Sequence, residues 1–185
     1  MQLHPAYPIV TDRLRLRPLT TADSEALLTY RGRADVCRYL PFEPMTPEVL
    51  GGRLRTDLSR TTITTEGQAL TLGVELAETG RLIGDLVLFF RSREYAGGEL
   101  GYVFHPDVAG QGYATEAARA MLGLAFDQLG LHRVIARLDA RNESSARLAA
   151  RLGMRREAHF VRNEIFKGEW ADELVYALLA EEWHA

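Results

Sequence analysis

The sequence predicts a single α/β domain with a mostly antiparallel sheet and one β–α–β crossover near its middle. The first observation is the alternation of arginine and leucine in residues 11–19, which is the period of a strand with one buried face. Residues 68–77 and 81–91 are strand-like and are joined by Glu-Thr-Gly, which indicates an antiparallel hairpin. A helical segment, residues 113–129, then separates two further strands, as in a crossover between parallel strands.

Two helices are expected between the first strand and the hairpin. Thr20 or Thr21 is suited to cap a helix that runs to about Arg31, because a threonine hydroxyl accepts hydrogen bonds from free amides. Three prolines break the chain after it, and Pro47 fits the first turn of a second helix. The apolar positions of this second helix are Val49, Leu50, Leu54 and Leu58.

The second half of the chain is expected to alternate strands and helices. The crossover helix connects a strand at residues 99–104 to a strand at residues 131–140. A short helix at residues 143–152 should end before Gly153, because glycine readily takes the left-handed conformation found after helix ends. A closing hairpin is predicted from strands at residues 155–166 and 170–179 around Lys167-Gly168.

Charge and composition exclude several classes of protein. The formal net charge of −3 offers no case for a basic nucleic-acid-binding face. The longest apolar run, residues 86–90, is far shorter than the ~20 residues that span a bilayer, and the N-terminal segment lacks the pattern of a secretory signal. Cys37 is the only cysteine, and the histidines show no metal-ligand spacing. We therefore expect a cytoplasmic protein that works without a metal, nucleic acid or a membrane.

The segment that says most about function is residues 99–117, where a strand enters a loop with two glycines that opens directly onto a helix. Gly110 and Gly112 carry no side chains that would block an approach to the amides at the positive end of the helix dipole. A hydrogen bond to a charged group contributes about 1.5–3 kcal/mol, so several amides together can hold a diphosphate. This arrangement predicts an anion-binding loop.

Two familiar phosphate-binding motifs do not fit the loop. The P-loop requires Gly-Lys-Ser/Thr, but the loop has no lysine, and the dinucleotide motif requires a third glycine where this chain has Thr115. An isolated Gly-x-Gly is also compatible with a tight strand-to-helix turn that binds nothing, and the loop residues alone leave this alternative open.

The loop sequence Gly110-Gln-Gly-Tyr-Ala-Thr-Glu-Ala117 resembles the acetyl-CoA motif of the GNAT superfamily of N-acetyltransferases. The resemblance is strongest to the group containing the ribosomal-protein N-terminal acetyltransferases (RimJ/RimL-like). Further similar segments follow in the family's order: Thr11-Asp-Arg-Leu-Arg-Leu-Arg-Pro18, Gly101-Tyr102, Asn142-Glu-Ser-Ser145 and Leu152-Gly-Met154. The chain departs from the motif at Ala109, where arginine or glutamine usually opens the loop, so weaker cofactor anchoring is expected.

The resemblance implies the GNAT fold, a central mixed and mostly antiparallel sheet flanked by helices, with two parallel strands that splay apart. The pantetheine of acetyl-CoA would lie in the gap and pair with the backbone of Val103 and Phe104. The residues that would hold the diphosphate are Gly110, Gln111, Gly112, Tyr113, Ala114 and Thr115. A homodimer is also an expectation drawn from the family.

Transfer of acetyl from a thioester to an amine requires a neutral amine and a proton donor for the leaving thiolate. Many relatives use a tyrosine as the donor, but the matching position here is Ala149, and the RimL-like alternative implies Ser145. Asn142 would bond pantetheine or orient the thioester, although it is equally suited to cap the helix. The resemblance points to Glu164 as the base, with Glu99 as a second candidate acting through water.

The acceptor is less well defined by these residues. A protein α-amine has a pKa of about 7.7–8.0, whereas deprotonating a lysine with a pKa of about 10.4 costs roughly 4–5 kcal/mol near neutral pH. One carboxylate base therefore suits an α-amine or a similarly acidic amine best, which mildly favours a peptide N-terminal α-amine as the acceptor. The alternatives are a small-molecule acceptor such as an antibiotic or a polyamine, a different acyl group, and a non-catalytic CoA-binding module.

Overall fold

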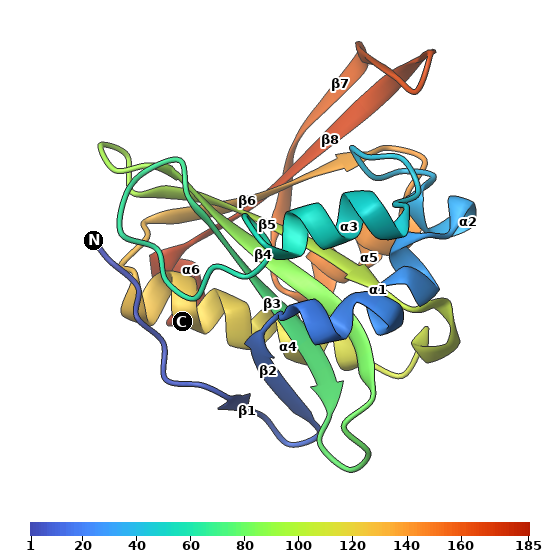
Figure 1. Ribbon diagram of the computed structural model, residues 1–185. Helices are drawn as coiled ribbons and strands as arrows, with labels where there is room; N and C mark the ends of the chain where they lie inside the picture. The colour runs from blue at the N-terminus through green and yellow to red at the C-terminus, as the bar shows by residue number, and fades with distance from the viewer.

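The computed structural model describes residues 1–185 as one eight-stranded sheet with helices on both faces (Figure 1). The strand order is β1-β2-β3-β4-β5-β6-β8-β7. The strands are β1 (Ile9–Val10), β2 (Leu14–Pro18), β3 (Ala69–Leu76), β4 (Leu82–Ser92), β5 (Gly97–Phe104), β6 (Arg133–Asp139), β7 (Arg155–Phe166) and β8 (Glu169–Leu179). The helices are α1 (Ser24–Arg31), α2 (Ala34–Cys37), α3 (Pro47–Leu54), α4 (Tyr113–Gly123), α5 (Glu143–Arg151) and α6 (Ala180–Trp183).

Every neighbouring pair of strands is antiparallel except β5 and β6, which confirms the predicted mixed sheet with one parallel pair. The parallel pairing ends where Glu99 faces Ile135, although both strands continue beyond that point. Gly98 lets Leu131, just before β6, pack closely against β5 ahead of the split, because a Cβ at Gly98 would lie only 2.5 Å from Leu131 Cδ1. The predicted splay is therefore present, and past Glu99 the edge of β5 that faces β6 has no strand partner.

The two faces of the sheet carry separate apolar cores. The larger core packs α4 and α5 on one face through Ala117, Met121 and Leu148, which are all buried. The smaller core packs α1 and α3 on the other face through Leu27 and Leu50. Because each helix buries one apolar side against the sheet, the ends of these helices are held at fixed positions around the split.

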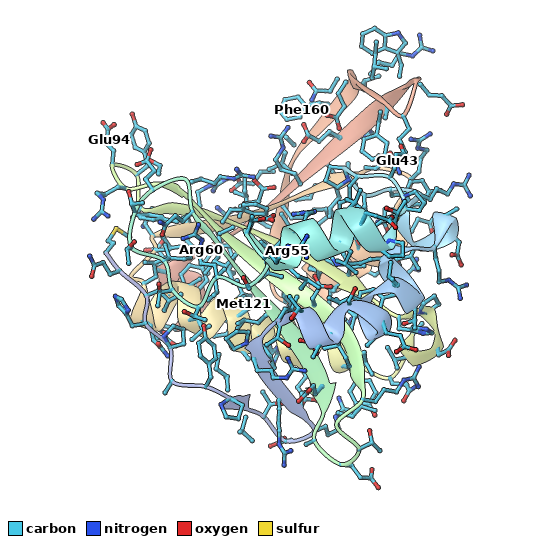
Figure 2. The ribbon with its side chains drawn as sticks, viewed as in Figure 1. Glu43, Arg55, Arg60, Glu94, Met121 and Phe160 are labelled. Atoms are coloured by element: carbon cyan, nitrogen blue, oxygen red, sulfur yellow. The ribbon has the colours of Figure 1, made fainter.

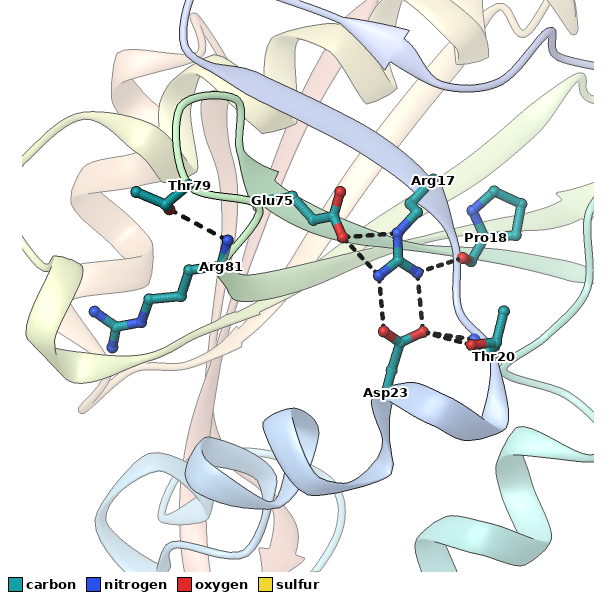
Figure 3. Close-up of polar contacts among 7 residues, drawn as sticks. All are labelled: Arg17, Pro18, Thr20, Asp23, Glu75, Thr79 and Arg81. Carbon is teal, nitrogen blue, oxygen red and sulfur yellow. Dashed lines mark hydrogen bonds and ion pairs between the residues drawn. The ribbon is translucent and has the colours of Figure 1, made fainter.

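A charged network joins β2, β3 and the start of α1 (Figure 3). Arg17 donates to Glu75 Oε1 and to both carboxylate oxygens of Asp23, at 2.6–2.9 Å, and Asp23 accepts the amide of Thr20 at 2.7 Å. Thr20 therefore stands at the cap of the turn that leads into α1, as predicted, and it forms a capping box with Asp23, whose carboxylate accepts the Thr20 amide. The network orients α1 against the sheet.

The remaining differences from the predicted elements lie in short segments and helix ends. Among the strands and α-helices, three were not expected: the two-residue strand β1 and the four-residue helices α2 and α6. The crossover helix ends as α4 at Gly123 and continues as a π-helical turn, Leu124–Gln128. Gly153 follows α5 with a φ of 84°, as predicted. None of the helices combines the length and the apolar character needed to cross a membrane.

Candidate active site

A cavity of about 780 Å³ opens at the split between β5 and β6. Its walls come from the end of β5, the loop before α4, one side of α5 along its whole length, and α2 with the segment that follows it. The predicted site residues that line it are Val103, Phe104, Gly110, Gly112, Tyr113, Ala114, Asn142 and Ser145. Gln111 and Thr115 belong to the same loop and helix turn but do not line the cavity. Most of the predicted cofactor site is thus brought to one place.

The backbone amides of residues 110–115 have no hydrogen-bond acceptor within the protein, so no side chain caps the start of α4. The first amide of this region with a partner belongs to Glu116, which donates to the Gly112 carbonyl at 3.1 Å. Gly110 and Gly112 have φ values of 79° and 83°, in the left-handed region where glycine is favoured. A run of free amides therefore stands at the positive end of α4 beside the cavity, as an anion-binding loop requires.

The loop is braced by residues at the start of β2. The Glu116 carboxylate accepts from Thr11 Oγ1 at 2.6 Å, from the Arg13 amide at 2.9 Å and from Arg13 Nε at 2.7 Å. Arg13 Nη1 also donates to the Gln111 carbonyl at 3.0 Å, and the guanidinium lies over the Tyr113 ring. Burial raises the pKa of Glu116, but the bonds from Thr11 and Arg13 outweigh it and hold that pKa below its ordinary value. Sequence reasoning missed this brace because its partners are about a hundred residues apart.

Asn142 caps α5, so that of its two predicted roles the capping role is present in the structure. Its Oδ1 accepts from the Ser145 amide at 3.2 Å and from Ser144 Oγ at 2.8 Å. The amide nitrogen Nδ2 makes no hydrogen bond within the protein and remains available at the cavity. Ser145 is half-buried in the first turn of the same helix, and its hydroxyl has no partner. Ala149 is fully buried and lies outside the cavity wall.

Tyr102 is a cavity residue that the sequence did not single out for chemistry. It precedes the expected pantetheine-binding residues on β5, and its hydroxyl donates to the Ser145 carbonyl at 3.0 Å. Burial raises the pKa of Tyr102 to about 12, so the phenol stays protonated at neutral pH. The pair Gly101-Tyr102 before the loop was the available signal. Tyr102 fixes the first turn of α5 relative to β5.

The two predicted base candidates lie outside the cavity wall, and the negative charge of each favours the charged form of Arg137. Glu99, at the last position of β5 that pairs with β6, accepts from Arg91 Nε at 2.9 Å. Glu164 is exposed on β7, opposite Ala171, on the hairpin that projects from the body of the protein (Figure 1). The carboxylate of Glu173, which is hydrogen-bonded to Arg137, is the main cause of a raised pKa of Arg137, and Glu99 and Glu164 raise it further. We call Glu99, Arg137, Glu164 and Glu173 the Arg137 cluster.

The tip of the β7–β8 hairpin is attached to the segment that lines the far end of the cavity. Lys167, the only lysine of the chain, donates from Nζ to the carbonyls of Cys37 at 2.7 Å and Phe42 at 3.0 Å. Arg141, in the β6–α5 turn, binds Glu169 at 3.2 Å and lies over the Tyr39 ring. Three segments distant in sequence are thereby held around one end of the cavity.

A buried ion pair fixes α1 against β4 next to the cavity. Arg31 donates to the two carboxylate oxygens of Asp85 at 2.5 and 2.9 Å, and the Tyr30 hydroxyl donates to the same carboxylate at 2.8 Å. Asp85 faces Val103 in the register of β4 and β5. Burial lowers the pKa of Arg31, but the carboxylate of Asp85 outweighs it and raises the pKa overall. The guanidinium therefore stays charged beneath α1.

Comparison with known proteins agrees with this geometry. The model of a family described as Acetyltransferase (GNAT) domain matches residues 13–155. The uncharacterised N-acetyltransferase YnaD of Bacillus subtilis (strain 168) is 34% identical over 178 residues, covering 95% of this chain and 99% of that protein. The crystal structure of a GNAT-family acetyltransferase from Bacillus anthracis has a TM-score of 0.84 at 33% identity, with 94% of this chain and 99% of that chain covered.

A third relative carries a named acceptor. The [ribosomal protein uS5]-alanine N-acetyltransferase of Escherichia coli (strain K12) is 30% identical over 84 residues, which is 45% of this chain and 43% of that enzyme. The family match spans the brace at Arg13, the free amides of residues 110–115 and the whole of α5. This chain therefore belongs to the GNAT family of N-acetyltransferases, which use acetyl-CoA.

Proposed function

We propose that this enzyme binds acetyl-CoA at the split of the sheet and acetylates a primary amine, with the α-amine of a protein or peptide N-terminus as its preferred acceptor. The observation that carries the proposal is the run of free amides at residues 110–115 beside an open strand edge. These residues fit the cofactor, because the amides suit a diphosphate and the free edge of β5 at Val103 and Phe104 suits the amide groups of pantetheine.

The chain's own residues have separable roles in this proposal. Acetyl-CoA supplies the acetyl group as a thioester. Asn142 Nδ2, which is free at the cavity, orients the ligand, while its Oδ1 holds the first turn of α5. The Ser145 hydroxyl, also free at the cavity, would give its proton to the sulfur that leaves and regain one from solvent. Tyr102 keeps Ser145 in place through the Ser145 carbonyl.

The base is proposed to come from the Arg137 cluster. Glu99 is our first choice on geometry, because it lies on β5 at the position where the sheet splits, a few residues before Val103. Glu164 is on the projecting hairpin, so it needs an acceptor that reaches along β7. The two act by accepting the amine's proton directly or through water. An α-amine requires only this modest assistance, since roughly a tenth or more of it is already neutral near pH 7.

The surface around the cluster supports a protein or peptide acceptor. Four large apolar side chains are exposed on the hairpin: Phe160, Val161, Ile165 and Trp170. Figure 2 shows Phe160 on the projecting part of this hairpin. The carboxylates of the cluster are partly neutralised by Arg91 and Arg137, so the surface lacks the strong acidity that a polycationic amine would favour. The RimJ/RimL-like grouping remains our proposal and is supported by the uS5-alanine enzyme.

The test is a thiol-release screen with acetyl-CoA against peptides with free N-termini, aminoglycosides and polyamines. We expect peptides to give the highest kcat/KM. Ser145→Ala should lower kcat by roughly 10²-fold with little change in the Kd for CoA, since general acid catalysis contributes on the order of 10²–10⁴-fold. Glu99→Gln and Glu164→Gln, each assayed across pH, should separate the two base candidates, because removing the base shifts the acidic limb of the rate profile.

Three outcomes would contradict separate parts of the proposal. Failure to bind CoA tighter than millimolar removes the cofactor assignment. Binding without thiol release from any amine identifies a non-catalytic CoA-binding module. A polyamine or aminoglycoside that reacts faster than every peptide replaces the acceptor class.

A further inference from the structure

Arg151 ends α5 with its guanidinium directed to the anion-binding loop instead of to a carboxylate. Its Nε lies 3.4 Å from Thr115 Oγ1, in the first turn of α4, and its side chain lines the cavity together with Gly110 and Gly112. No carboxylate oxygen lies within ion-pair distance of this guanidinium. An uncompensated cation therefore stands next to the free amides.

Three other guanidinium groups near the cavity are already occupied. Arg141, the second arginine in the cavity wall, binds both oxygens of Asp139 at 2.7 and 2.9 Å. Arg13 is bonded to Glu116 and to the Gln111 carbonyl. Arg147, on the same helix as Arg151, pairs with Glu143 at 3.1 Å and lies outside the cavity wall. Among these arginines, only Arg151 has its donors free for a ligand.

CoA carries two separate anionic groups, and the amides can account for only one of them. The amides of residues 110–115 suit the diphosphate. The ribose 3′-phosphate is a second group with a charge of about −1.5 to −2 at neutral pH, and it needs a partner of its own. Guanidinium binds phosphate oxygens through parallel hydrogen bonds, which makes arginine well suited to this group.

We propose that Arg151 binds the 3′-phosphate of CoA and thereby makes the enzyme discriminate CoA from dephospho-CoA. This inference rests on the proposed cofactor site but extends it to a residue at the end of α5, outside the loop. The contact also joins α5 to the cofactor, so binding should hold the helix that carries Ser145.

The experiment is calorimetric titration of the whole protein with CoA and with dephospho-CoA, without an acceptor. The variants are Arg151→Gln and the matched control Arg147→Gln, which removes a guanidinium from the same helix. The native protein should bind CoA at least tenfold tighter than dephospho-CoA. The affinity of Arg151→Gln for CoA should fall roughly tenfold, because one exposed charge-assisted contact is lost. Its affinity for dephospho-CoA should hardly change, so the variant no longer discriminates between the two ligands. Arg147→Gln should bind both ligands like the native protein.

Two further measurements strengthen the test. Arg151→Lys should recover part of the discrimination, since lysine keeps the charge but not the paired donors. Raising the salt concentration should reduce the difference in affinity between CoA and dephospho-CoA in the native protein, because salt screens exposed charges. It should have no such effect in Arg151→Gln, where that difference is already absent.

The possible failures are distinguishable. Equal losses of affinity for the two ligands in Arg151→Gln would show a contact with the diphosphate and overturn the 3′-phosphate assignment. Unchanged affinities would overturn any phosphate contact by Arg151. If the native protein binds neither ligand, the cofactor site itself is wrong. Thermal unfolding of each variant without ligand shows whether the protein is folded.

Discussion

Replacing Glu116 with glutamine tests whether the start of β2 holds the anion-binding loop. The carboxylate accepts from Thr11 Oγ1 at 2.6 Å and from the amide, Nε and Nη2 of Arg13 at 2.7–2.9 Å. Glutamine keeps one acceptor oxygen but presents an NH₂ group to the guanidinium. The variant therefore loses the two contacts between side chains that are assisted by charge.

The structure sets the expected size of this effect. Two fully buried charge-assisted hydrogen bonds would contribute about 3–6 kcal/mol together. Arg13 is 47% exposed, so water takes the place of part of that interaction, and we expect the free energy of unfolding to fall by about 1–2 kcal/mol. If the loop loses the same support for its ligand, the affinity for CoA falls by roughly fivefold to thirtyfold, since about 1.4 kcal/mol corresponds to tenfold.

Urea unfolding and calorimetric titration with CoA measure the two quantities. Asp57→Asn is the matched control, because its ion pair with Arg53 is exposed at the end of α3 and outside the cavity wall. Its loss should change the free energy of unfolding by less than about 0.5 kcal/mol. A Glu116→Gln protein with unchanged stability and unchanged CoA affinity would refute the brace. A loss of stability with unchanged CoA affinity would show that the anion-binding loop keeps its shape without the contacts from Thr11 and Arg13.

The same residue gives a pH dependence. The pKa of Glu116 is lower in the folded protein than in the unfolded chain, so its contribution is fully present above the unfolded value of about 4.3. That contribution is lost as the pH falls through the folded pKa. The difference in unfolding free energy between the native protein and Glu116→Gln should therefore be constant near neutral pH and shrink below about pH 4. A difference that grows on acidification would contradict the assignment.

Two further predictions concern the scaffold and the loop. Arg31→Leu should lower the free energy of unfolding by about 3–5 kcal/mol, because it leaves the buried Asp85 carboxylate without its cation, with the Tyr30 hydroxyl as its remaining donor. Adding Asp85→Leu should recover much of the loss in chemical denaturation, and a single-variant loss under about 1 kcal/mol would refute this. Gly110→Ala and Gly130→Ala should each lower the free energy of unfolding by about 1–2 kcal/mol, because both glycines have a positive φ and no neighbouring atom that a Cβ would meet. Only Gly110 lines the cavity, so only Gly110→Ala should also weaken CoA binding. Equal CoA affinities of the two variants would contradict the loop assignment.

The elements that could be predicted are those whose pattern is local. Alternating leucines of β2, Leu14 and Leu16, are both buried, because a strand with one covered face must repeat every two residues. The helix α4 begins at Tyr113 as expected, because Gly112 takes the left-handed conformation just before it and the apolar residues after it repeat with the period of a helix. In contrast, β1 is only two residues long and exists through its pairing with β2, so no period could reveal it.

The site was predictable where the backbone makes it and less so where distant side chains meet. The loop glycines, Asn142 and Ser145 lie at one cavity because they follow β5 and β6 directly in sequence. The neighbourhood of Glu99 and Glu164 depends on the register of five strands, and the partner of Arg13 lies across the fold. That the Arg151 guanidinium has no carboxylate partner could be recognised only from the structure, once the ion pairs of the neighbouring arginines were known.

The single lysine has a practical consequence for an enzyme whose chemistry consumes amines. The Lys167 ammonium is held by the carbonyl oxygens of Cys37, at the end of α2, and of Phe42, and it must leave both before its nitrogen can react. Its rate of modification by a mild chemical acylating reagent therefore measures how often the hairpin tip detaches. Peptide mass spectrometry can follow this opening at one native side chain, without any introduced label.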